Sequence, residues 1–178
     1  MTNRAAVHEA GHAIISLVLG RAVKRASIIE DDDTAGRVTH RPIGDWFQPD
    51  IEIDGRTRRR IKTEIMTFWA GTLAEERQGE STPEQLEVGF ASDRASISDL
   101  AVYSTGSIYE AEAYIEWLRR RTEALLNRWG VWSAIEAVAD ALIEERELSG
   151  RRVREIYHAT VGPLVAASAG EASESAPG

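Results

Sequence analysis

The chain has 178 residues, of which 43% are hydrophobic, a formal net charge of −8 and no cysteine. This length and apolar content predict one compact domain with a sizeable core. The negative charge argues against nucleic acid as a general partner, and the lack of cysteine excludes disulfides and thiolate metal sites. No apolar run approaches the ~20 residues of a transmembrane helix, so we expect a soluble, cytoplasmic protein without a membrane span.

The first predicted helix, residues 4–19, contains the sequence His-Glu-Ala-Gly-His at positions 8–12. Residues four apart share one face of a helix, so the imidazoles of His8 and His12 point in the same direction. Two neutral histidines can hold one Zn²⁺, and Glu9 can then act as a general base. The alternative is a pair of buried structural histidines. The helix is apolar on most of its circumference, which predicts a central position in the fold.

After Gly20, which can end this helix, the pattern predicts a small β hairpin. A strand over residues 22–31 leads into a polar turn over 32–36 and a returning strand over 37–40. An irregular loop follows over 41–55. Together with the helices described below, the hairpin predicts a mainly α-helical α+β fold.

A second helix over residues 57–78 has an apolar stripe that ends in Glu75 or Glu76. A carboxylate in that position should face a cation or the solvent edge of the core. A short helix that begins near residue 90 places Asp93 in its first turn, where an aspartate commonly caps the helix or offsets its dipole. Asp93 also heads the inward face, so it is our first choice for a third metal ligand, with Glu75 or Glu76 as the alternative.

The remaining helices have clear start signals, namely a proline-containing cap at 82–85 and capping boxes at 107–110 and 133–136. The last two predict an antiparallel helix pair that serves as a scaffold. A shorter helix follows Gly150. The Ala/Ser/Glu/Gly-rich segment 164–178 predicts a disordered tail, which leaves a domain over 1–163.

Several segments resemble, in the same order, the peptidase domain of FtsH-type ATP-dependent zinc metalloproteases. The resemblance lies in four stretches: the zinc motif (residues 8–13), a Gly-Gly-Arg-Ala-Ala-Glu-Glu segment (69–76), a Gly-Ala-x-Asn-Asp helix (89–101) and the run that ends the domain (138–150). Together these stretches span essentially the whole domain.

In that family two histidines and an aspartate bind zinc, and the motif glutamate is the general base. The resemblance implies these roles for His8, His12, Asp93 and Glu9 respectively. It further implies a mainly helical domain built around the zinc-motif helix, with a small β element whose edge pairs with extended substrate.

That edge falls on the strand near residues 24–30 and suggests Ser27, Ile28 and Ile29 as substrate-binding residues. Glu75 and Glu76 are second-sphere candidates, because such partners orient metal ligands.

Two departures from the family affect the functional prediction. The membrane anchor and ATPase domain that precede the family's zinc motif do not occur in this sequence, and Thr72 and Ser92 replace a family Arg and Asn. We therefore predict a zinc metalloendopeptidase that cleaves unfolded or extended polypeptides. The alternatives are a catalytically silent, zinc-stabilised adaptor or regulatory module, and a peptidase subunit for a separate ATPase, assembled as a homo-hexamer by analogy.

Overall fold

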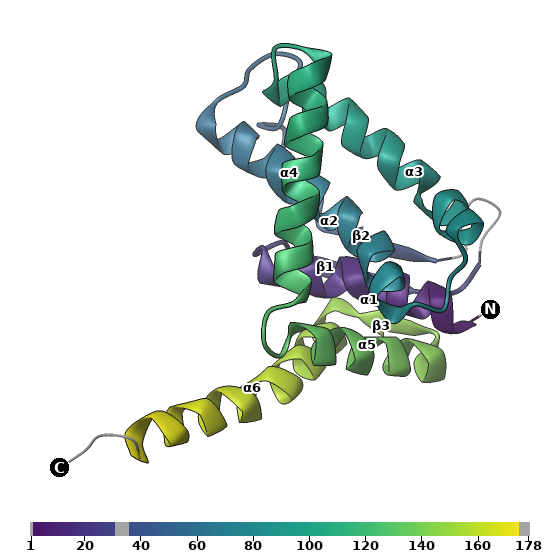
Figure 1. Ribbon diagram of the computed structural model, residues 1–178, viewed down its shortest axis with the longest axis vertical. Helices are drawn as coiled ribbons and strands as arrows, with labels where there is room; N and C mark the ends of the chain where they lie inside the picture. The colour runs from purple at the N-terminus through teal and green to yellow at the C-terminus, as the bar shows by residue number, and fades with distance from the viewer. Residues whose placement is uncertain (1, 31–35, 175–178) are drawn as a thin grey trace.

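Figure 1 shows the fold as a computed structural model, which describes residues 2–30 and 36–174, with side chains over 4–30 and 36–162. Its elements are α1 (Thr2–Val18), β1 (Val23–Ser27), β2 (Arg37–His40), α2 (Gly55–Gln78), α3 (Pro83–Ala101), the 3₁₀ turn η1 (Val102–Ser104), α4 (Ile108–Leu126), α5 (Val131–Glu145), β3 (Glu147–Ser149) and α6 (Gly150–Glu174). The predicted class, mainly helical with a small β element, is confirmed. Except for Gly36, the predicted turn at 32–36 lies outside the described residues.

Helix α1 lies at the centre of the fold, between α2 and α5 (Figure 1). Its residues Ala6, Ala10, Ala13 and Ile14 are all completely buried. One apolar cluster joins α1 to the sheet and α5, and a second fills the space between α2, α3 and α4. The predicted central position of the first helix is therefore confirmed.

The two helices α1 and α2 approach each other closely through small residues. A Cβ atom on Gly11 would lie 2.5 Å from the carbonyl oxygen of Ala70 and 2.9 Å from the Cβ of Ala74. Both distances are below van der Waals contact, so only glycine allows α1 to lie this close to the backbone of α2. This contact fixes the face of α1 that carries the two histidines against α2.

The sheet has three antiparallel strands in the order β2-β1-β3. Ala26 at the middle of β1 pairs with Val38 on one side and with Leu148 on the other. Strand β3 was not predicted, because three residues between two helices carry no readable alternation. It adds to the predicted hairpin and makes β1 the central strand.

Several helix boundaries follow from their caps. Thr82 and Gln85 form the complete capping box that opens α3, and Ser107 caps α4 by accepting a hydrogen bond from the backbone N–H of Glu110. The helix predicted to begin near residue 90 is not separate, since α3 runs without a break from Pro83.

The predicted antiparallel pair of α4 and α5 is wrong. In Figure 1, α4 packs along α2, whereas α5 lies under α1 and across the end of α4. The predicted capping box at 133–136 also does not form, because Gly130 adopts a left-handed conformation (φ 76°) and α5 starts directly after it. That turn redirects the chain from one core cluster to the other.

Helix α6 begins where Gly150 contacts β1, since a Cβ there would lie 1.9 Å from the carbonyl oxygen of Val23. The helix continues to Glu174 and so enters the segment predicted to be a disordered tail. The division of the chain into a domain over 1–163 and a tail stays a prediction. Among the described residues, no helix combines the length and apolar content that crossing a bilayer requires.

We expect Gly11→Ala to lower the free energy of unfolding by about 1–3 kcal/mol, because the added methyl group must push α1 away from α2. Alanine's better helix propensity offsets only part of this loss. Urea denaturation measures the change. Gly55→Ala is the matched control, since a Cβ there meets no heavy atom within 4 Å. A Gly11→Ala protein as stable as the wild type would contradict the close packing of the two helices.

Candidate metal centre

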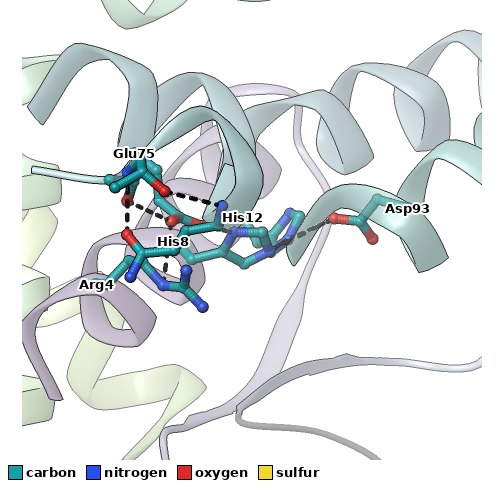
Figure 2. A network of polar contacts seen from close by, with 8 residues as sticks. Arg4, His8, His12, Glu75 and Asp93 are labelled. Atoms are coloured by element: carbon teal, nitrogen blue, oxygen red, sulfur yellow. Dashed lines mark hydrogen bonds and ion pairs between the residues drawn. The ribbon is translucent and has the colours of Figure 1, made fainter. Parts of the chain in front are cut away.

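The structure brings His8, His12 and Asp93 together from two helices, α1 and α3 (Figure 2). The Nε2 atoms of the two histidines lie 2.9 Å apart. Oδ2 of Asp93 lies 3.2 Å from Nε2 of His12 and 3.5 Å from Nε2 of His8. These three atoms form a compact triangle, as the sequence predicts for a metal site with Asp93 as the third ligand.

The second nitrogen of each imidazole is held by α2. Nδ1 of His8 donates a hydrogen bond to Oε1 of Glu75 (2.6 Å), and Nδ1 of His12 donates to the backbone carbonyl of Thr67 (2.7 Å). A carbonyl oxygen can only accept, so His12 carries a proton on Nδ1. In the neutral rings each Nε2 atom then carries a lone pair, and the hydrogen bonds at Nδ1 hold both rings in the orientation of metal ligands.

Three potential ligand atoms therefore converge on one point, and a proton or a metal ion between them offsets their mutual repulsion. A tetrahedral zinc ion with ligands about 2.0–2.1 Å away holds those ligands roughly 3.3 Å apart, which agrees with the triangle. The space is preserved by Gly71 on α2, where a Cβ would lie 2.5 Å and 2.6 Å from the Nε2 atoms of His12 and His8. The residues present fit a Zn²⁺ ion.

The close approach of these groups also shifts their pKa values. Burial opposes the charged form of His8, but the hydrogen bonds that it donates to Asp93 and Glu75 and the charge of Glu9 raise its pKa to about 10. Burial also disfavours the Asp93 carboxylate, yet the two imidazoles hold its pKa well below the usual range. Carboxylates surround the pair of histidines and favour a positive charge between them.

The two glutamates predicted as alternative ligands or second-sphere residues differ in position. Glu75 is buried and accepts from His8, from the hydroxyl of Ser81 (2.9 Å) and, in a longer ion pair, from Arg4 (3.5 Å). Glu76 faces α4, where it pairs with Arg119 (3.2 Å). The structure therefore places Glu75 against the outer nitrogen of His8, and it does not bring Glu76 to the cluster.

Glu9 lies beside the ligands and is only 6% exposed. Among the described residues, its Oε2 has no hydrogen-bond partner. Burial raises its pKa, and the charges of the two imidazoles reduce that effect. A Cβ on Gly36, just before β2, would lie 2.9 Å from the Cγ of Glu9, so Glu9 sits between the candidate metal ligands and the start of that strand.

All four side chains open into one cavity of about 630 Å³. Its walls come from α1, α2, α3 and β2, and they include Ala5, Gly36, Val38, His40, Phe68, Val88 and Ser92. The cavity therefore joins the candidate metal ligands, Glu9 and an edge strand of the sheet.

The substrate-binding edge predicted at Ser27, Ile28 and Ile29 needs correction. Strand β1 is hydrogen-bonded on both sides. The backbone N–H of Ile28 donates to the carbonyl of Arg146 (2.9 Å), and that of Ile29 donates to the hydroxyl of Ser27 (3.2 Å). A strand with two neighbours has no edge for a third, so the prediction fails because β3 was not foreseen.

Two functional positions were missed by sequence reasoning. The carbonyl of Thr67 carries no side-chain signal, because any residue supplies a backbone acceptor. Gly71 could have been found, since a glycine inside a helix costs about 1 kcal/mol relative to alanine and usually has a packing reason.

No protein-family model matches the chain, and no curated protein matches it significantly in sequence. The resemblance to FtsH-type peptidases therefore rests on the motifs themselves and stays a prediction.

We expect the wild-type protein to bind one zinc ion and Asp93→Ala to lose most of that affinity, because two histidines alone leave the site incomplete. Glu75→Gln should weaken binding by about 10–100-fold, since it removes the negative charge from the acceptor that orients His8. Competition with a chromophoric chelator measures the affinities. Glu76→Gln is the control and should bind zinc like the wild type; full occupancy in Asp93→Ala would refute its assignment as a ligand.

Proposed function

We propose that this protein is a zinc-dependent metalloendopeptidase. The observation that carries the proposal is the buried carboxylate of Glu9, which has an oxygen without a partner and lies beside three converging ligand atoms in one cavity. Burying a carboxylate oxygen without a partner is costly. Such a cost is common at catalytic sites, where the group must be ready to exchange a proton.

His8, His12 and Asp93 would hold the zinc ion. When bound there, zinc supplies a Lewis acid that lowers the pKa of a water and polarises a substrate carbonyl. Three protein ligands are typical of catalytic zinc sites, whereas structural sites usually have four. Glu75 and the carbonyl of Thr67 keep the imidazoles in place throughout the reaction.

Glu9 performs the proton transfers. Its Oε2 accepts a proton from the water whose oxygen forms a bond to the peptide carbonyl carbon. The same oxygen then donates that proton to the amide nitrogen as the C–N bond breaks, which releases a carboxylic acid and an amine. Its burial in the cavity wall keeps the carboxylate in one position during both steps.

Glu9 also weighs against the alternative of a silent adaptor. A purely structural metal site requires no carboxylate beside its ligands, and an uncharged residue at position 9 would avoid the cost of burial. A separate ATPase partner and a homo-hexamer are proposals that rest on the family resemblance alone, as does a cytoplasmic location.

We expect Glu9→Gln to lower cleavage of a fluorescently quenched, unfolded protein by at least about 100-fold, because the amide cannot accept the proton. Zinc content should remain that of the wild type, since Glu9 is not a ligand. Equal activity in both proteins would indicate a contaminating protease. Inactivity of the zinc-loaded wild type on several unfolded substrates would favour the adaptor.

Strand β2 is the best candidate for binding the substrate backbone. It is an edge of the sheet, and Arg37, Val38 and His40 line the cavity that contains Glu9. An extended peptide added to this edge would gain main-chain hydrogen bonds while it runs past the metal ligands. Only unfolded or extended polypeptides can pair in this way, so the exposed edge of β2 supports the proposed substrate class.

We expect N-methylation of single backbone amides in a substrate peptide to raise KM at alternate positions, because every second N–H of an added strand faces the sheet. Each lost hydrogen bond should weaken binding by about 2- to 10-fold. A series of singly methylated peptides, assayed with the zinc-loaded protein, measures the pattern. A uniform effect at all positions would contradict strand addition at β2.

A further inference from the structure

Arg21 and His40 also line this cavity, in a part that we call its second end, and neither side chain takes part in the proposed proton transfers. Gly20 adopts φ 76°, and the chain turns back so that the backbone N–H of Arg21 donates to the carbonyl of Ser16 (2.8 Å). This turn ends α1 and directs Arg21 toward α2. His40, at the end of β2, is 2.8 Å from the hydroxyl of Ser16.

Positive charge exceeds negative charge at this end. Nη2 of Arg21 lies 2.7 Å from Oε2 of Glu64, and Nη2 of Arg60 lies 2.5 Å from Oε1 of the same carboxylate. Two guanidinium groups thus share one carboxylate, which leaves a surplus of one positive charge in the trio. Glu64 is only 4% exposed, so water screens this surplus poorly.

His40 does not offset the surplus. Burial, together with the charges of Arg21, His12 and Arg60, lowers its pKa to about 3. It is therefore a neutral imidazole among positive groups at neutral pH. The charges that act on it are those of cations, which agrees with a positive potential at this end of the cavity.

The guanidinium groups also have unused donors. Among the described residues, the Nε atoms of Arg21 and Arg60 are buried without a hydrogen-bond partner. A buried donor without an acceptor is unfavourable, and the side chain of Arg21 is only 11% exposed although it lines the cavity. A carboxylate in the cavity would satisfy both the charge and the donor, with the fork geometry that guanidinium groups prefer.

We propose that Arg21 forms a specificity subsite that binds a carboxylate of the peptide substrate; this inference rests on the proposed function. Arg21 and His40 are both hydrogen-bonded to Ser16, which lies one helical turn from His12, about 6 Å along α1. An extended peptide advances about 3.3 Å per residue. The subsite therefore lies about two residues from the scissile bond. The carboxylate comes from an acidic side chain or from the C-terminus of the peptide.

The test compares four quenched peptides that otherwise share one sequence. The second residue after the cleaved bond is either Glu or Gln, and it is the last residue of the peptide. The C-terminus of that residue is either free or amidated. The zinc-loaded protein should cleave carboxylate peptides with a kcat/KM about tenfold above that of the peptide lacking both carboxylates. A preference that follows Glu identifies a side chain, and one that follows the free terminus identifies the C-terminus.

The variants assign this preference to Arg21. Arg21→Gln should reduce the ratio to about one, and Arg21→Lys should retain part of it because the charge remains. Arg60→Gln tests the surplus of positive charge independently. Glu64 would then neutralise Arg21, so the ratio of kcat/KM values should also fall. Arg119→Gln removes an equal charge on α4, far along the sequence from the subsite, and should keep the wild-type ratio.

Failure of this inference is distinguishable from failure of the proposed function. A wild type that cleaves all four peptides equally, or an Arg21→Gln protein that keeps the preference, overturns the subsite while leaving a peptidase. If the wild type cleaves none of them, the affinity of the metal-free protein for labelled peptides is measured by fluorescence anisotropy, and this affinity tests the subsite. Tighter binding of carboxylate peptides that Arg21→Gln removes supports the subsite, and equal binding of all four overturns it.

Discussion

The contact between α1 and the backbone of α2 is the constraint on which the rest of the structure depends. Gly11 allows α1 to reach the carbonyl oxygen of Ala70, and the neighbouring Gly71 leaves room for the two imidazoles. The same approach brings Glu75 and the carbonyl of Thr67 within hydrogen-bond distance of the Nδ1 atoms. One helix–helix contact thus orients both histidines and keeps the space between them open.

Charge is distributed unevenly along the cavity. Carboxylates gather at the end formed by α1 and α3, where two imidazoles and a proposed zinc ion would balance them. Arginines gather at the end formed by the α1–β1 turn and α2, where Glu64 balances only one of two. At the first end the carboxylates favour a positive charge between the histidines, and at the second end one guanidinium has no carboxylate of its own. A metal ion at one end and a substrate carboxylate at the other would complete the balance, with Glu9 near the first.

Much of the site can be predicted from sequence because its parts are local. The spacing of His8 and His12 depends only on helical periodicity, and Glu9 is part of the same turn. Asp93 was predicted as a third ligand from its place on an inward helix face and from the family resemblance. Helix α3 does bring it to the histidines. Glu75 and Glu76 could not be separated, since adjacent helix residues point about 100° apart and the direction of the core was unknown. The α1–α2 contact assigns Glu75 to the histidines, and the α2–α4 contact assigns Glu76 to the opposite helix.

By itself the sequence determined the mainly helical class, the central helix and the shared face of the two histidines, because hydrophobic periodicity and residue spacing are properties of short segments. Only the tertiary structure decided which strand is an edge, since that depends on β3, which follows β1 by about 120 residues. It also decided the direction of α5, the outer partners of the histidines and the surplus charge at Arg21. Each of these depends on groups distant in sequence that meet only when the helices pack.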